Sequence, residues 1–171
     1  MIKKIDTGFD GLFLLKPNIF KDTRGVFYES WKNEYYKDAG IEQDFLQDNI
    51  SISNKNVLRG LHIQKKQGQL VTVISGKIFD VVVDVRPESK TFKQHFSIEL
   101  NADNPQQLYM APGFAHGFCV LSDTAILHYK CTQYYDKHSE DGIFRNTPEF
   151  GISWPGDNFI ISERDSNFHE L

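Results

Sequence analysis

The sequence predicts an all-β fold, an antiparallel jelly roll with a short N-terminal arm and one or two short helices. Runs of β-branched and aromatic residues recur along the chain, most plainly at 70–75 (LVTVIS) and 78–85 (IFDVVVDV). Turn-forming residues separate such runs, as at Gly76-Lys77 and in the cluster NADNPQQ at 101–107. Short strands at regular spacing with turn signals between them are typical of all-β sandwiches and jelly rolls.

The first expected elements are a helix and a strand. The segment 29–40 (ESWKNEYYKDAG) is the clearest helix candidate, because Gly40 supplies a stop signal. The segment 57–64 (VLRGLHIQ) has strand composition, but His62 stands between Leu61 and Ile63. A polar ring at that position is out of place if the strand only builds a core.

The strand 78–85 has two distinct faces, since side chains alternate along a strand. One face carries Phe79, Val81, Val83 and Val85, and the other carries Ile78, Asp80, Val82 and Asp84.

The remaining elements follow in order. A strand is expected at 93–100, and the apolar run 107–123 is broken at Pro112-Gly113. The run 125–135 alternates, so that one side carries Ala125, Leu127, Tyr129 and Cys131. A weaker helical piece is expected in the last ten residues.

Composition limits the classes of function. The 171 residues, 40% of them hydrophobic, suffice for one domain with a buried core, which we expect to span 1–171. Net charge is −4, and no basic stripe supports binding to nucleic acid. Asp6 and Asp10 interrupt the N-terminal apolar run, so a secretory signal is not expected, and no run is long enough to span a membrane. Cys119 and Cys131 are expected to be free, buried thiols of a cytoplasmic protein.

Metal, nucleophilic and nucleotide-cofactor chemistry lack their usual motifs. The first metal-binding position of a jelly-roll enzyme needs His-x-His, but the sequence gives His62-Ile63-Gln64. There is no Gly-x-Ser-x-Gly turn, no phosphate-binding glycine loop and no dinucleotide fingerprint. We therefore expect no metal and no cofactor.

Acid–base chemistry remains, and His62, Tyr129 and Asp165 are its candidate residues. A histidine beside a carboxylate is a base near neutral pH, and a tyrosine in an apolar pocket can supply a proton. Each residue also has a structural interpretation: a hydrogen-bonded histidine, a core tyrosine and a solvated aspartate. From the residues alone, both interpretations stay open.

Several motifs in order together resemble one family. They are DTRGVFYES (22–30), QDN (47–49), VLRGLH (57–62), GKIFDVVVDVR (76–86), PGFAHGFCVLSDTA (112–125), YKCTQYY (129–135), GISWP (151–155) and SERD (162–165). In this set the chain is similar to the dTDP-4-dehydrorhamnose 3,5-epimerases, which are metal-independent cupins. The likeness covers nearly the whole chain.

The resemblance implies a role for each matching residue. His62 matches the general base that removes a proton beside a ketone, Asp165 the carboxylate that orients it, and Tyr129 the acid on the opposite face of the sugar. Arg59 and His116 match groups near the diphosphate, and Tyr135 matches an aromatic that lines the site. The resemblance also implies nucleotide contacts, which are Arg24, Glu29, Gln47 and Asn49.

The implied reaction inverts C3, C5 or both of a nucleotide-linked 4-keto-6-deoxy sugar. The implied partners are the nucleotide-diphosphate sugar and a second copy of the chain, in a homodimer with an exchanged N-terminal arm that contributes Arg24 and Glu29. Neither nucleic acid nor membrane is an expected partner. Thymidine as the base follows from the resemblance alone.

The sequence departs from the family pattern at Gln69, where a lysine is usual. A neutral amide donates hydrogen bonds but cannot neutralise an oxyanion. Lys65, Lys66 or Lys130 could supply the charge instead. The loss leaves open an epimerase of one position, a 3,4-ketoisomerase, or an inactive nucleotide-sugar-binding cupin.

Two further departures and one question of strand parity remain. Ile50 and Ile63 replace the residues common after QDN and GLH, and either substitution could alter the shape of the pocket. Arg59 and His62 would point to opposite faces of a regular strand, so a bulge at Gly60 is needed to bring both to the ligand.

Overall fold

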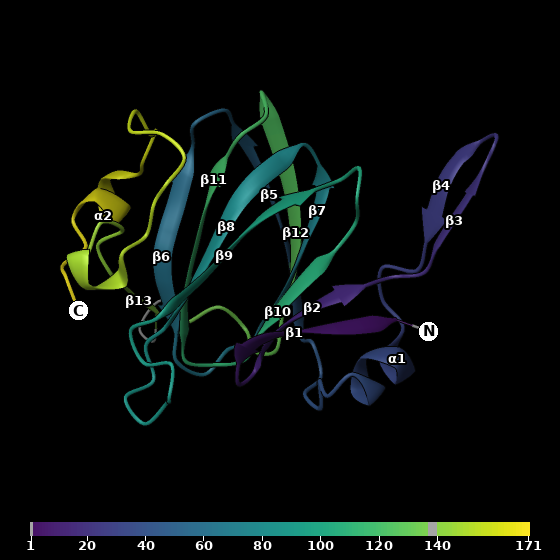
Figure 1. The fold of residues 1–171 in the computed structure, drawn as a ribbon, viewed down its shortest axis with the longest axis horizontal. Helices are drawn as coiled ribbons and strands as arrows, with labels where there is room; N and C mark the ends of the chain where they lie inside the picture. Colours follow the sequence, from purple (N-terminus) through teal and green to yellow (C-terminus); the bar gives the residue numbers. More distant parts are fainter. Residues whose placement is uncertain (1, 137–139) are drawn as a thin grey trace.

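Alternating strands pair into two antiparallel sheets that lie face to face (Figure 1). The computed structural model describes residues 2–136 and 140–171. In spatial order, the first sheet contains β1 (Lys3–Phe9), β2 (Leu12–Lys16), β10 (Gln107–Met110), β7 (Gln69–Ser75), β12 (Thr124–Cys131) and β5 (Gln47–Asn54). The second contains β13 (Glu140–Gly142), β6 (Leu58–Gln64), β11 (Phe114–Val120), β8 (Lys77–Asp84) and β9 (His95–Asn101).

All strand pairs within these sheets are antiparallel in the described residues. The predicted all-β jelly roll is therefore confirmed. The remaining elements are a two-stranded hairpin of β3 (Ile19–Asp22) and β4 (Gly25–Tyr28), the helices α1 (Asn33–Asp38) and α2 (Glu163–Ser166), and a 3₁₀ turn, η1 (Pro148–Phe150).

The two faces that alternation gives β8 contact two different apolar clusters. Ile78 and Val82 point between the sheets, into a core that also takes side chains from β2, β7, β10, β11 and β12. Val81 and Val83 point the other way, into a second cluster with Ile143 and residues of β6. Full burial of each such side chain stabilises the fold by roughly 1.5–3 kcal/mol.

The C-terminal segment covers the outer face of the second sheet. Phe150 is buried there, and Trp154 packs at the edge of the same cluster. In Figure 1 this segment, with α2, lies outside β6. The expected helix in the last ten residues is thus confirmed as α2, and its position brings residues near the chain end against β6.

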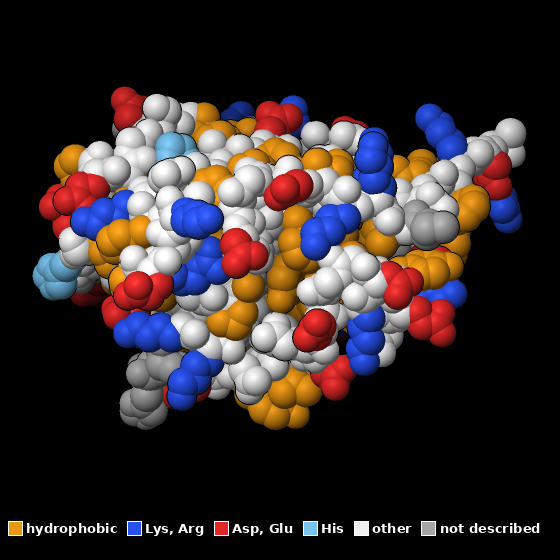
Figure 2. Space-filling model, turned by 60° about the horizontal axis from the view of Figure 1, so that its bottom comes forward, with side chains coloured by type: hydrophobic (Ala, Val, Ile, Leu, Met, Phe, Trp, Pro, Cys, Tyr) orange, Lys and Arg blue, Asp and Glu red, His pale blue; other side chains and the backbone are white. Residues whose placement is uncertain are grey.

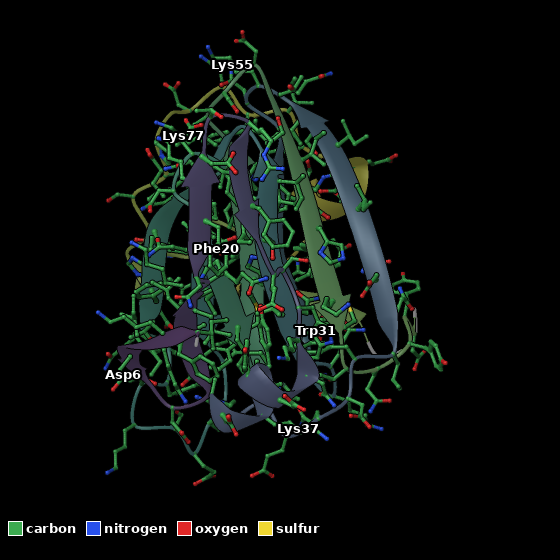
Figure 3. The ribbon with its side chains drawn as sticks, turned by 90° about the vertical axis from the view of Figure 1, so that its right-hand side faces the viewer. Asp6, Phe20, Trp31, Lys37, Lys55 and Lys77 are labelled. Carbon is green, nitrogen blue, oxygen red and sulfur yellow. The ribbon has the colours of Figure 1, made fainter. Side chains whose placement is uncertain are left out.

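The hairpin β3–β4 projects from the body of the molecule (Figure 1). Its Phe20 and Phe27 side chains are 58% and 66% exposed, which is unusual for aromatic rings. Figure 3 looks from this side, with Phe20 in front of the sheets and Trp31 nearer α1. The hairpin is the short N-terminal arm that the sequence predicts.

The predicted helix at 29–40 is shorter in the structure, where α1 spans Asn33–Asp38. The chain at Ser30 is held outside the helix, because its carbonyl oxygen accepts hydrogen bonds from Tyr36 Oη (2.8 Å) and Gln107 Nε2 (2.9 Å). The predicted stop is correct: Gly40 has φ +98° just after the helix.

The predicted strand at 125–135 also ends early, at Cys131. The Thr132 N–H still donates to the Gly68 carbonyl oxygen at 3.0 Å, but the Gly68 N–H donates to the Thr132 side chain, at Oγ1 (2.8 Å), instead of to a backbone carbonyl. Residues 133–135 therefore form a loop beside the end of the first sheet.

Charges of both signs are interspersed over the face shown in Figure 2, without a patch of one sign. Lys55 and Lys77 lie at one end of the sheets, and Lys37, in α1, lies at the other end (Figure 3). In the described part of the chain, no helix is long and apolar enough to cross a membrane.

Candidate active site

A cavity of about 200 Å³ lies between the two sheets. Its lining residues on β5, β7 and β12 come from the first sheet, and those on β6 and β11 come from the second. The lining includes Gln47, Asn49, Arg59, His62, Gln69, His116, Tyr129 and Tyr135, eight of the residues predicted from the sequence. Strands that are far apart in the chain thus bring these side chains to one place.

His62 lines the cavity because its neighbours on β6 face the other way. Leu61 and Ile63 are buried in the outer cluster under the C-terminal segment, and the alternation of the strand turns His62 inward. The Nε2 atom of His62 lies 2.9 Å from Oδ1 of Asp165. The imidazole therefore has one nitrogen engaged by a carboxylate, and Nδ1 remains for proton exchange.

Asp165 is only 5% exposed, although it lies near the end of the chain. Helix α2 places it there, and Ser162 caps that helix by accepting the Asp165 N–H at 3.1 Å. The second carboxylate oxygen, Oδ2, accepts the backbone N–H of Gly60 at 2.9 Å. Burial alone would raise the pKa of Asp165, but the hydrogen bonds from His62 and Gly60 outweigh it, so the pKa lies below its usual value.

The bulge predicted at Gly60 is present. Arg59 pairs with Phe118 and His62 pairs with His116, so β6 uses one more residue than β11 over the same stretch. Gly60 has φ +108°, and a Cβ there would lie 2.5 Å from the carbonyl oxygen of His116. The extra residue brings Arg59 and His62 to the same face, as the parity argument requires.

A second imidazole–carboxylate pair stands beside the first. His116 is the direct cross-strand neighbour of His62, and its Nε2 lies 3.0 Å from both carboxylate oxygens of Asp80, which is fully buried. Arg59 donates from Nε to Ser53 Oγ at 3.1 Å. This wall can therefore hold an anion through a guanidinium and an imidazole.

Tyr129 lies on the facing wall, on β12. It pairs with Asn49 of β5 and Val71 of β7, and all three line the cavity. The neighbouring row of the same sheet contains Gln47, Gln69 and Cys131. His62 and Tyr129 thus belong to different sheets, and a ligand between them would meet an imidazole on one face and a phenol on the other.

The loop after β12 is tied to this wall by amide hydrogen bonds. Gln47 Nε2 donates to Asn49 Oδ1 at 2.9 Å, and Gln47 Oε1 accepts the backbone N–H of Tyr135 at 3.0 Å. Asn49 Nδ2 in turn donates to the Cys131 sulfur at 3.4 Å. The amides hold Tyr135 beside the cavity that it lines.

None of the three lysines proposed to replace a charge at position 69 lines the cavity. Lys130 Nζ is 2.8 Å from Asp48 Oδ1, on the opposite face of the sheet from Tyr129. Lys65 is exposed and lies 3.5 Å from Asp141, and Lys66 is also exposed. Within this chain, none of these lysines is placed beside the cavity to supply the charge.

The two isoleucines that could alter the pocket lie outside its lining. Ile50 is 69% exposed, since β5 turns its Gln47 and Asn49 side chains inward and Ile50 outward. Ile63 is buried in the outer cluster. Neither residue lines the cavity.

Arg24 and Glu29 lie outside the cavity of their own chain. Arg24 is at the tip of the hairpin, where it forms a bidentate ion pair with Asp22. Glu29 follows β4 and is exposed. These two residues, predicted to contact a nucleotide, are therefore available only to a ligand outside their own cavity.

Sequence reasoning missed several residues of the site. Asp80 could have been predicted, because a carboxylate among apolar residues on the inward face of β8 needs a hydrogen-bonding partner. Gln67 and Ser51 line the cavity without a local motif. Phe168 packs edge-to-face on the His62 ring, with ring centroids 5.7 Å apart. No local motif predicts this contact between the end of the chain and β6.

Within residues 2–136 and 140–171, no cluster of three or more His, Cys, Asp or Glu side chains could hold a metal ion. The chemistry that the described side chains themselves offer is proton transfer.

Comparison with known proteins places the chain in one family. The family model for dTDP-4-dehydrorhamnose 3,5-epimerase matches residues 6–171. The dTDP-4-dehydrorhamnose 3,5-epimerase of Escherichia coli K12 is 44% identical over 172 residues, which cover 98% of this chain and 93% of the relative.

Two solved structures share the fold. The dTDP-6-deoxy-D-glucose-3,5-epimerase of Legionella pneumophila, solved with dTDP-4-keto-L-rhamnose, is 43% identical with a TM-score of 0.96, covering 99% of this chain and 93% of that one. The 3'-monoepimerase ChmJ of Streptomyces bikiniensis, solved with dTDP-quinovose, is 30% identical with a TM-score of 0.89, covering 95% and 84%. The chain therefore belongs to the dTDP-4-dehydrorhamnose 3,5-epimerase family of isomerases.

Proposed function

We propose that the chain inverts C3, C5 or both of dTDP-4-dehydro-6-deoxy-D-glucose, giving dTDP-4-dehydro-L-rhamnose when both centres are inverted. The observation that carries the proposal is the His62–Asp165 pair on one wall of a cavity whose other wall holds Tyr129. The ligands of the Legionella and Streptomyces relatives, dTDP-4-keto-L-rhamnose and dTDP-quinovose, support a dTDP-sugar as substrate.

The substrate's ketone makes the chemistry possible. A C–H bond beside a carbonyl is acidic because the electron pair left on carbon can move onto the ketone oxygen as an enolate. C3 and C5 both flank the C4 ketone, so one carbonyl activates both centres. No oxidation is needed, since the carbon loses a proton and regains one.

In the proposed mechanism, His62 takes the proton from one face of the sugar. The resulting imidazolium is stabilised by Asp165, and the C–H electron pair forms the enolate. Tyr129 then gives its proton to the opposite face of the same carbon, and the electron pair returns from oxygen to form the new C–H bond. A positioned base or acid contributes roughly 10²–10⁴ in rate. Proton exchange with solvent restores both side chains.

Arg59 and His116 are proposed to hold the diphosphate. The guanidinium is steadied by Ser53, and the His116 imidazole is backed by the buried Asp80. Binding energy at the diphosphate would place the sugar between His62 and Tyr129.

The hairpin β3–β4 supports a homodimer in which the arms are exchanged. Exposed aromatic rings on a projecting hairpin gain by burial against a second copy, and Arg24 and Glu29 would then reach the partner's nucleotide. Sedimentation should give a dimer. A monomer that turns over substrate at the full rate would exclude arm exchange.

Within this proposal, inversion of one centre only is the narrower candidate. Gln69 favours it, because a neutral amide lines the cavity where the resemblance implies a lysine. The likeness to ChmJ, a 3'-monoepimerase, also supports it.

Proton NMR in deuterated water separates the candidates. The wild type should take up deuterium at C3 and C5, or at one of them if only one centre is inverted. His62→Ala should bind the nucleotide sugar without exchange. If no label enters either carbon, the proposed epimerase function is wrong.

A further inference from the structure

Two glutamine side chains on the cavity wall form a directed chain of hydrogen bonds. Gln69 Nε2 donates to Gln67 Oε1 at 3.0 Å, and Gln67 Nε2 donates to the backbone carbonyl oxygen of Gln133 at 2.8 Å. Gln67 and Gln69 are 7% and 9% exposed, and both line the cavity. This chain of hydrogen bonds therefore runs from the cavity wall to the loop after β12.

The direction of this chain is fixed by its last member. A backbone carbonyl oxygen can only accept, so Gln67 must present its NH₂ group to Gln133. Its own oxygen is thereby turned towards Gln69, which must donate in its turn. The alternative orientation, with either amide rotated by 180°, would place two acceptors or two donors against each other.

The directed chain determines which groups Gln69 has left. One N–H is used by Gln67, so the carbonyl oxygen and one N–H remain. Donation through the nitrogen polarises an amide and strengthens its oxygen as an acceptor. A hydroxyl group can engage both remaining groups of the amide, since an alcohol both donates and accepts. An enolate oxygen only accepts, so it would leave the carbonyl oxygen of Gln69 without a donor.

We infer that Gln69, held by Gln67, is a specificity-determining residue that binds a ring hydroxyl of the sugar, at C2 or C3, through its carbonyl oxygen. The inference rests on the proposed function and identifies the sugar as one that carries a hydroxyl group on C2 or on C3. Gln69 is a binding residue in this account, and Gln67 is a positioning residue.

The test compares three nucleotide-linked 4-keto-6-deoxy sugars: the parent, its 2-deoxy analogue and its 3-deoxy analogue. All three keep hydrogens at C3 and C5, so deuterium uptake can be read on each. The variants are Gln69→Met, Gln67→Met and the double variant. Gln94→Met is the matched control, because Gln94 is exposed on the loop before β9.

The wild type should lose roughly three- to ten-fold in kcat/KM on one deoxy analogue, mainly through KM. Gln69→Met should lose a similar factor on the parent and almost nothing further on that analogue. Adding Gln67→Met to Gln69→Met should cost little more, because the two residues act as one unit. An equal loss by Gln69→Met on all three sugars would overturn the inference.

A binding measurement keeps this test separate from the proposed function. Calorimetric titration of His62→Ala and His62→Ala/Gln69→Met with the three sugars should show the same discrimination in Kd. If the wild type exchanges no deuterium but Gln69 still discriminates in binding, the proposed reaction fails and the inference stands. If exchange occurs but Kd discrimination is absent with and without Gln69, the inference fails and the reaction stands.

Discussion

Replacing Asp165 with asparagine should stop proton abstraction by reversing the tautomer of His62. The carboxylate accepts two hydrogen bonds, from His62 Nε2 and from the Gly60 N–H, both at 2.9 Å. Asparagine has one oxygen and one NH₂ group. The Gly60 N–H can only donate, so the asparagine oxygen must face it, and the NH₂ group must face His62. The imidazole then has to accept at Nε2 and carry its proton on Nδ1, the nitrogen that the base needs unprotonated.

The size of the effect follows from this geometry. A neutral His62 with its proton on Nδ1 cannot act as a base, so kcat should fall by the roughly 10²–10⁴ that a positioned base contributes. The charge-assisted hydrogen bond between His62 and the Asp165 carboxylate is also lost, and such a bond contributes about 1.5–3 kcal/mol to the stability of the fold. KM should change little, because Asp165 does not line the cavity.

Asp80→Asn is the matched control. Both Asp80 oxygens lie 3.0 Å from His116 Nε2, so the asparagine oxygen can face that nitrogen and leave the His116 tautomer unchanged. Its effect should be within about ten-fold and should fall on KM, since a single hydrogen bond is weakened. Deuterium uptake from solvent, followed by proton NMR, measures both variants. An Asp165→Asn rate within ten-fold of wild type, in a variant that stays folded at the assay temperature, would refute the tautomer argument.

Three further predictions concern the framework of the site. Gly60→Ala should lower the free energy of unfolding by about 2–4 kcal/mol, because its Cβ would meet a β11 carbonyl oxygen at 2.5 Å; urea denaturation would show this, and an unchanged midpoint would contradict it. Burial raises the pKa of the Cys119 and Cys131 thiols to about 11, so a thiol reagent at pH 8 should label neither in the native protein and both in denaturant. Burial alone would raise the pKa of Asp84, but hydrogen bonds from its neighbours hold that pKa below its usual value. The stabilising contribution of Asp84 is therefore complete above about pH 3.9 and is lost as the pH falls further. Asp84→Asn should flatten the acid limb of a plot of the free energy of unfolding against pH.

Local patterns predicted the framework of this fold well. The β8 alternation set two apolar clusters on opposite faces, and Gly40 marked the end of α1. The extent of α1 could not be predicted, because the chain at Ser30 is held by Gln107, 77 residues away. The early end of β12 similarly depends on a contact with Gly68. Elements whose ends are set by distant partners lie beyond what local sequence shows.

The candidate site divides in the same way. Strand parity required a bulge at Gly60, and the structure has it. Spacing alone could not bring Asp165 to His62, which lies 103 residues away, and only the family resemblance paired them. The partner of His116 was missed as well, although Asp80 is a carboxylate on an otherwise largely apolar strand face and so needed a partner.

Helix α2 follows all the described strands in chain order, yet it supplies the carboxylate on which His62 depends. The carboxylate partner of His62 thus comes from the part of the chain that is synthesised last, after every described strand. Under the proposed mechanism, a chain that ends before residue 165 would contain all the residues that line the cavity and would still be inactive.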